Sequence, residues 1–215
     1  MSGASEPAGP CGPDVPSELR EHPDRFRWNE RYREADPDFA PHQLVTDALA
    51  AGLPAGPVLE LACGRSGSAL ALAAAGRTVT AVDISDHALA QLGRQARRRG
   101  LDARVRRVLA DLPAYPVAAG RYALVLATRY WDPDVFGSAA AAVLPGGLLG
   151  WEALAQAPGG ERGPYRVAHG ELGARLPATF TVLAEELYDS ERHRVSRLLA
   201  RRQPAAPGLG GAERG

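Results

Sequence analysis

Acidic side chains stand within or directly after three short segments, in the first half of the chain, that predict strands. Glu60 lies inside the first segment, Asp83 closes the second, and Asp111 follows the third. A turn containing Gly64 and Gly67 follows the first segment and leads into an Ala/Leu-rich stretch. A carboxylate after a strand can accept hydrogen bonds from both hydroxyls of a ribose, and glycines before a helix let a polar ligand approach the backbone. This spacing predicts a nucleoside site.

Glu60 and Ala62 decide which nucleoside cofactor the turn favours. A carboxylate four residues before Gly64 would repel a pyrophosphate but attract the positive amino group of an amino acid. Ala62 also stands where the dinucleotide-binding sequence G-x-G-x-x-G has its first glycine. Both features favour S-adenosylmethionine over NAD.

Each of these residues also has a purely structural interpretation. The glycines could form an ordinary strand-to-helix turn, and Glu60 could be a buried carboxylate that local backbone amides satisfy. Asp83 could cap the following helix, although Ser85 is better placed to do so. Asp111, which could accept from an adenine amino group, could equally be a solvated loop carboxylate.

The elements that must position these residues alternate between strands and helices. Apolar runs predict strands at 58–62, 77–82, 105–109, 122–127 and 147–153, and apolar spacing predicts helices at 24–34, 41–51, 68–75, 86–99 and 169–176. Two further strands, 179–187 and 194–200, are joined by a polar turn and predict a hairpin. We therefore expect an α/β fold with a doubly wound, mostly parallel seven-stranded sheet and a C-terminal antiparallel hairpin.

Composition narrows the classes of protein further. The 215 residues include 25 Lys plus Arg and 25 Asp plus Glu, so the formal net charge of zero argues against a dedicated nucleic-acid binder. All 25 basic residues are Arg, which excludes Schiff-base chemistry and the P-loop. With only Cys11 and Cys63, a Cys-based zinc site cannot form, and we expect no metal. No apolar run is long enough to span a membrane, so we expect a cytoplasmic protein.

The ends of the chain differ in composition from the middle. Residues 1–17 and 203–215 are rich in Gly and Pro and poor in large apolar groups, so we expect disordered tails. Residues 18–202 then form one domain that begins with the helices at 24–51. The sequence does not indicate the oligomeric state.

At this point the chain resembles a known family. The segment VLELACGRSGSALALAAAG, with AVDIS at 81–85, ADL at 110–112, YALVLATRYW at 122–131 and LPGG at 144–147, is similar to class I S-adenosylmethionine-dependent methyltransferases. The sequence WNERYRE and the turn A-C-G-R-S-G most resemble the tellurite-resistance and thiopurine methyltransferase-like group. The resemblance implies S-adenosyl-L-methionine as cofactor, held by residues that include Trp28, Tyr32, Glu60, Ala62, Gly64, Gly67, Asp83, Ile84, Asp111, Leu112 and Ala127. Trp28 and Tyr32 could instead be an apolar helix face packed on the core.

The segment after the fourth strand predicts where an acceptor would bind. Arg129 could hold an acidic group of a small-molecule substrate, and Tyr130 could contact a planar substrate or the sulfonium. Among the five histidines we favour His169 as a base, because it follows the fifth strand in a loop. Thiols, selenols and other soft anions need no strong base, whereas hydroxyls and amines often do.

Three alternatives remain open at this stage. The chain could be a NAD(P)-dependent oxidoreductase, or it could bind S-adenosylmethionine without transferring a methyl group. Seven arginines between 94 and 107 could form an RNA groove, but without interleaved aromatic residues they favour a solvated face.

Overall fold

The computed structural model describes residues 15–157, 159, 163, 165–189 and 193–204. These residues cluster into two compact units. The first unit is drawn from Met1–His42 and Glu60–Tyr115, and the second from Gln43–Leu59 and Pro116–Gly215. Most of the two predicted tails, and Cys11 with them, lie outside the described residues, and the single domain at 18–202 stays a prediction.

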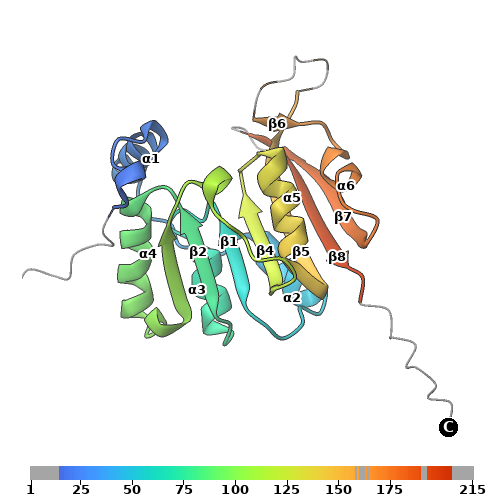
Figure 1. Ribbon diagram of the computed structural model, residues 1–215, viewed down its shortest axis with the longest axis horizontal. Helices are drawn as coiled ribbons and strands as arrows, with labels where there is room; N and C mark the ends of the chain where they lie inside the picture. The colour runs from blue at the N-terminus through green and yellow to red at the C-terminus, as the bar shows by residue number, and fades with distance from the viewer. Residues whose placement is uncertain (1–14, 158, 160–162, 164, 190–192, 205–215) are drawn as a thin grey trace, which may run out of the picture. The chain divides into compact units, whose positions relative to one another are not determined.

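The first unit contains two complete strands and the helices that cover them. Its elements are η1 (Ser17–Leu19), α1 (Pro23–Glu34), the end of β1 (Val58–Leu61), α3 (Gly67–Ala74), β2 (Val79–Asp83), α4 (Asp86–Arg98), η2 (Asp102–Arg104), β3 (Val105–Leu109) and η3 (Leu112–Ala114). The parallel strands β2 and β3 are paired from Val79 opposite Val105 to Asp83 opposite Leu109. Helix α4 packs against α1 and against both strands (Figure 1).

Local sequence explains where the helices of this unit begin and end. Helix α1 starts at Pro23, and the imidazole of His22 accepts from the backbone N–H of Asp24. Helix α4 starts after Ser85, whose hydroxyl accepts from the N–H of Ala88 at 3.1 Å. Gly100 follows the end of α4 with a φ of 68°, a conformation that suits glycine after a helix.

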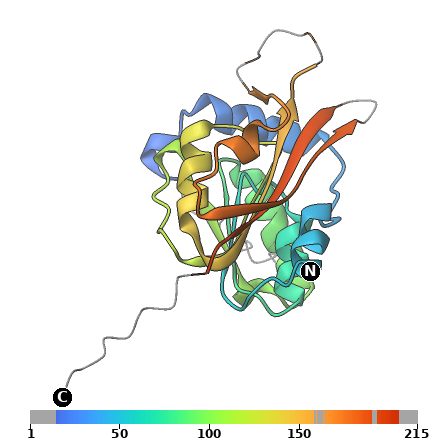
Figure 2. The same cartoon turned by 90° about the vertical axis from the view of Figure 1, so that its right-hand side faces the viewer.

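The second unit contains the antiparallel part of the fold. Its elements are the start of β1, α2 (Gln43–Ala50), β4 (Tyr122–Thr128), α5 (Pro133–Ala142), β5 (Val143–Ala155), β6 (Arg166–Val167), α6 (Glu171–Ala174), β7 (Phe180–Asp189) and β8 (Arg194–Arg202). Strand β5 is parallel to β4 and β6 and antiparallel to β8, which is antiparallel to β7. Helices α5 and α2 lie on opposite faces of these strands (Figure 2).

The order of hydrogen-bonded strands is β3-β2-β1-β4-β5-β8-β7, with β6 beside β5. The predicted α/β sheet with a C-terminal antiparallel hairpin is thus confirmed, and the two-residue strand β6 is additional. Residues 139–142 are an Ala-rich stretch within helix α5, and the helix begins earlier, at Pro133, with Asp132 as its cap. The sequence LPGG lies within β5, where the pairing with β4 changes register, rather than forming a turn before it.

Buried aromatic and charged side chains fix the second unit internally. Trp151 is fully buried, and its ring meets that of Phe136 edge-on at 5.1 Å. Glu152, also buried, accepts two N–H groups of Arg197 on the neighbouring strand, at 2.9 and 3.1 Å. In the part of the chain that the structure describes, no helix is both long and apolar enough to cross a bilayer.

Candidate functional site

Glu60 is a buried acid whose pKa is strongly raised. Its side chain is almost fully buried in β1, and one carboxylate oxygen accepts the hydroxyl of Ser66 at 2.5 Å. Burial, and next the negative charge of Asp83, raise the pKa of Glu60 from 4.5 to about 8, although the Ser66 hydrogen bond opposes this. At neutral pH the carboxyl group is therefore mostly protonated, and a bound cation would ionise it.

The turn after β1 has an unusual backbone. Three alternate residues, Ala62, Gly64 and Ser66, have positive φ values of 47°, 55° and 31°. Only glycine adopts this region without strain, so Ala62 and Ser66 store strain of the kind that clusters at functional sites. The N–H of Gly64 donates to Asp83 at 2.7 Å, and Ser66 caps α3 by accepting from the N–H of Ala69 at 2.7 Å. These bonds hold the turn in place.

Asp83 ends β2 with both carboxylate oxygens engaged by backbone groups. One oxygen accepts from Gly64 and the other from the N–H of Ser85 at 2.8 Å. Burial raises the pKa of Asp83, while these backbone bonds lower it. Each carboxylate oxygen has a second lone pair, so two ribose hydroxyls could still donate to it. The helix cap is Ser85, so Asp83 does not cap α4.

The two glycines of the turn are close to the protein's own chain. A Cβ on Gly64 would collide with the hydroxyl of Tyr32, and a Cβ on Gly67 would collide with the backbone carbonyls of Phe39 and Ala40. Substitution at either position would thus displace α1 or the segment after it. Their contact with a cofactor stays a prediction.

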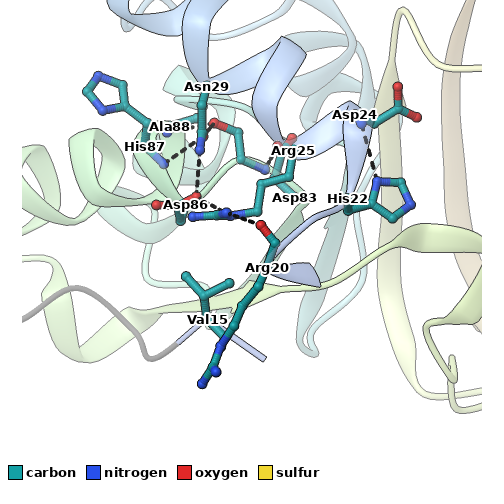
Figure 3. A network of polar contacts seen from close by, with 11 residues as sticks. Val15, Arg20, His22, Asp24, Arg25, Asn29, Asp83, Asp86, His87 and Ala88 are labelled. Atoms are coloured by element: carbon teal, nitrogen blue, oxygen red, sulfur yellow. Dashed lines mark hydrogen bonds and ion pairs between the residues drawn. The ribbon is translucent and has the colours of Figure 1, made fainter. Parts of the chain in front are cut away.

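A polar network, which the sequence did not reveal, joins α1 to the end of β2. The buried amide of Asn29 accepts from the Ser85 hydroxyl at 2.7 Å and from the N–H of His87 at 3.1 Å, and it donates to Asp86 at 2.7 Å. Arg25 donates to the same Asp86 oxygen at 2.7 Å. Figure 3 shows Asn29 and Arg25 reaching α4 from α1. The sequence indicates this network only through the spacing of Arg25 and Asn29, two polar residues that lie four positions apart.

Trp28 and Tyr32 lie on α1, half-buried, with their ring centroids 6.1 Å apart. Their described ring contacts include arginines: Arg27 and Arg31 lie over Trp28, and Arg65 lies 5.1 Å from the centroid of Tyr32. The two aromatic side chains are therefore not simply an apolar face packed on the core.

The residues predicted around an adenine ring lie at the ends of β2 and β3. Ile84 is half-buried and Leu112 is buried beside Asp111. An Asp111 carboxylate oxygen is 3.9 Å from the Nε2 atom of His22, the residue before α1. Asp111 is therefore not simply a solvated carboxylate, and its contact with adenine stays a prediction.

The predicted acceptor residues belong to the second unit. Arg129 is exposed directly after β4 with a φ of 55°, and the carbonyl of its neighbour Tyr130 accepts the indole N–H of Trp151 at 2.9 Å. His169 is exposed in the turn before α6, and Ala127 is buried within β4. Their roles at an acceptor and at the cofactor stay predictions.

Two further features of the described residues are their capacity for metal binding and the thiol of Cys63. No three His, Cys, Asp or Glu side chains among residues 15–157, 159, 163, 165–189 and 193–204 form a group that could hold a metal ion. Cys63 is buried, and burial together with the charges of Asp83 and Glu60 raises the pKa of its thiol well above the usual value. Cys63 is therefore a poor nucleophile.

Comparison with known proteins agrees with this arrangement. Residues 58–147 match the methyltransferase domain family. A search of curated proteins found no match. Similar solved structures include TehB from Haemophilus influenzae, with 19% identity, a TM-score of 0.64 and coverage of 83% of this chain and 67% of that one. Geranyl diphosphate C-methyltransferase from Streptomyces coelicolor A3(2) has 16% identity, a TM-score of 0.60 and coverage of 74% of each chain.

A third similar structure is the cyclase SpnF, with 19% identity, a TM-score of 0.62 and coverage of 76% of this chain and 81% of that one. The TM-scores show a shared fold, and the family match spans Glu60, Asp83 and Asp111. Residues 58–147 therefore match a methyltransferase domain, and the chain has the same fold as these solved structures.

Proposed function

We propose that the first unit binds S-adenosyl-L-methionine and that the protein transfers its methyl group to a small molecule. The observation that carries this proposal is the pair of buried carboxyl groups, Glu60 and Asp83, joined through the turn from Gly64 to Ser66. Asp83 retains lone pairs for the ribose hydroxyls. Glu60 would ionise beside the amino group of the cofactor, whereas its carboxylate would repel a pyrophosphate.

The acceptor we favour is a soft nucleophile such as a thiol or a chalcogen oxyanion. Methyl transfer from a sulfonium is an in-line displacement, so alignment and removal of water are the main tasks of the enzyme. His169 is exposed, and no hydrogen bond to its ring is described in the structure. An acceptor that is already anionic needs no oriented base, so this position of His169 fits such an acceptor. A natural-product hydroxyl or amine, with His169 as base, is the alternative acceptor.

Calorimetric titration tests the cofactor. We expect saturable binding of S-adenosylmethionine and S-adenosylhomocysteine and none of NAD. In the variant Asp83→Asn, affinity for both adenosyl ligands should fall by about 1–3 kcal/mol, the usual cost of losing a hydrogen bond to a charged group. The exposed Asp134→Asn on α5 serves as the matched control. Binding of NAD alone would contradict the assignment of Glu60.

A second candidate function is binding of S-adenosylmethionine without methyl transfer. SpnF, a cyclase by name, has the same fold, so the fold also accommodates another reaction. The exposed position of His169 is consistent with this candidate. Formation of S-adenosylhomocysteine during turnover with an acceptor separates the two functions, because a protein that only binds the cofactor produces none.

A further inference from the structure

Helix α1, which the structure describes in full, has one buried residue, the polar Asn29. Its Oδ1 atom accepts from the Ser85 hydroxyl at 2.7 Å and from the backbone N–H of His87 at 3.1 Å. Its Nδ2 group donates to Asp86 at 2.7 Å (Figure 3). A buried amide that uses both its donor and its acceptor has one favourable orientation. Asn29 therefore holds the Ser85 hydroxyl in a defined position.

Ser85 connects Asn29 to the carboxylate at the end of β2. It is fully buried, and its hydroxyl donates to Asn29 while accepting from the N–H of Ala88. The backbone N–H of the same residue donates to one carboxylate oxygen of Asp83 at 2.8 Å. Because a hydrogen bond weakens steeply as its angle falls, displacement of Ser85 would allow the Asp83 carboxylate to rotate.

The second anchor of Asp83 also lies against α1. The other carboxylate oxygen accepts from the N–H of Gly64 at 2.7 Å, and the hydroxyl of Tyr32 lies so close to Gly64 that a Cβ there would collide with it. Asn29 and Tyr32 are three positions apart, so they are neighbours on the surface of α1. This side of α1 thus contacts both residues whose N–H groups hold Asp83.

We propose that Asn29 is a positioning residue for the ribose of S-adenosyl-L-methionine: through Ser85 it fixes the orientation in which the Asp83 carboxylate accepts the ribose hydroxyls. Two such bonds form together only when the carboxylate is held at both oxygens. The inference rests on the proposed function and deepens it, because it assigns part of the specificity for an intact ribose to a helix that precedes all the strands.

A purely structural role for Asn29 makes a different prediction. The same amide joins α1 to α4 through Asp86, to which Arg25 also donates at 2.7 Å. If Asn29 only holds α1 against α4, its loss weakens all adenosyl ligands by the same factor, with or without ribose hydroxyls. If Asn29 orients Asp83, the ligands that carry these hydroxyls lose more affinity than those that lack them.

The experiment compares S-adenosylhomocysteine with its 2′,3′-dideoxy analogue, which lacks both ribose hydroxyls, by calorimetric titration. The unaltered protein should bind the complete ligand about 10- to 100-fold more tightly, the range expected for a hydrogen bond to a charged group. In Asn29→Ala this preference should fall to about 3-fold or less, because the carboxylate is no longer oriented for two hydroxyls. Affinity for the dideoxy analogue should stay unchanged.

Ser85→Ala interrupts the same path from its other end, and it tests the inference even where Asn29→Ala does not fold. This variant keeps the backbone N–H that donates to Asp83 and removes the hydroxyl that donates to Asn29. The preference for the complete ribose should therefore fall as it does in Asn29→Ala. The double variant should lose no more than either single variant, because both substitutions break one path.

Two controls separate this path from the attachment of α1 to α4. Arg25→Met removes the other bond from α1 to Asp86 without touching Ser85, and it should keep the full preference. The exchange of Asn29→Asp with Asp86→Asn reverses donor and acceptor between the two helices. It keeps an acceptor for the Ser85 hydroxyl, so the preference should be retained.

Three outcomes would overturn the inference while leaving methyl transfer as the proposed function. They are an undiminished preference in Asn29→Ala or Ser85→Ala, an equal loss of affinity for both ligands, and equal binding of both ligands by the unaltered protein. Failure of the unaltered protein to bind S-adenosylhomocysteine would instead refute the proposed function itself, and the inference with it.

Discussion

Replacing Glu60 by glutamine should make the protein more stable in alkaline solution and weaken cofactor binding at the same time. Glutamine has the shape of the protonated acid but cannot ionise, so it removes the cost of a buried negative charge. The side chain of Glu60 is 3% exposed, and its only described side-chain partner is Ser66. The charge is therefore expensive in the protein without ligand and useful only beside a cation.

The magnitude and the sign follow from the pKa of Glu60. Its value of about 8 in the folded protein lies above the usual 4.5, so the folded state holds the proton more tightly than the unfolded chain does. The stability that this proton contributes is fully present below pH 4.5 and is lost as the pH rises through 8. At ~1.4 kcal/mol for each pH unit, the full loss is about 5 kcal/mol. Glu60→Gln should escape this loss.

Urea unfolding at several pH values between 5 and 9 measures the effect. The free energy of unfolding of Glu60→Gln should exceed that of the unaltered protein by an amount that grows with pH, reaching several kcal/mol at about pH 9. The exposed Glu34→Gln on α1 should show no such growth. A stability difference that stays constant with pH would refute the reasoning, because it would mean that Glu60 is ionised and satisfied in the absence of ligand.

Three further variants test other parts of the structure. Asn29→Ala should lower the free energy of unfolding by about 2–3 kcal/mol in urea titrations, since it leaves the buried Ser85 hydroxyl without an acceptor; a change below about 0.5 kcal/mol would show that the network adds nothing. Arg197→Met should cost about 3–5 kcal/mol by leaving Glu152 charged and buried, and adding Glu152→Gln should recover most of it; no recovery would mean that packing, not charge, is at stake. His169→Ala should reduce turnover of a hydroxyl acceptor by about 10²–10⁴ while leaving a thiol acceptor and cofactor affinity unchanged, and equal losses for both acceptors would exclude its role as base.

Much of the fold follows from short-range patterns in the sequence. Strand β3 has the predicted bounds because Val105, Val108 and Leu109 lie between a short helical turn and a polar loop. Helix α4 ends one residue earlier than predicted, before Gly100. The pattern was less informative in residues 133–155. There the run of alanines hides the start of α5 at Pro133, and β5 continues through a register change that depends on pairing with β4.

Residues of the candidate site could be predicted only where the type and position of a single residue were enough to identify it. Glu60 could be chosen because it lies four residues before Gly64, Asp83 because it follows the second predicted strand, and Ser85 as a cap from its residue type. Asn29 could not be chosen in this way. Its three partners lie 56 to 58 positions later in the chain, and the sequence does not specify how α1 packs against α4. The contacts of Arg65 could not be predicted for a related reason: its partner, the carbonyl of Tyr32, lies 33 residues earlier in the chain.

The first unit carries several local costs within a few residues of one another. Glu60 is an acid buried where ionisation is unfavourable, Ala62 and Ser66 have strained backbones, and Arg65 is a buried cation with no acidic partner among the residues that the structure describes. Such costs persist only where the surrounding structure, or a bound ligand, compensates them. The amino group of the proposed cofactor would compensate the buried acid, so binding of this ligand should stabilise the turn by more than the contact area implies.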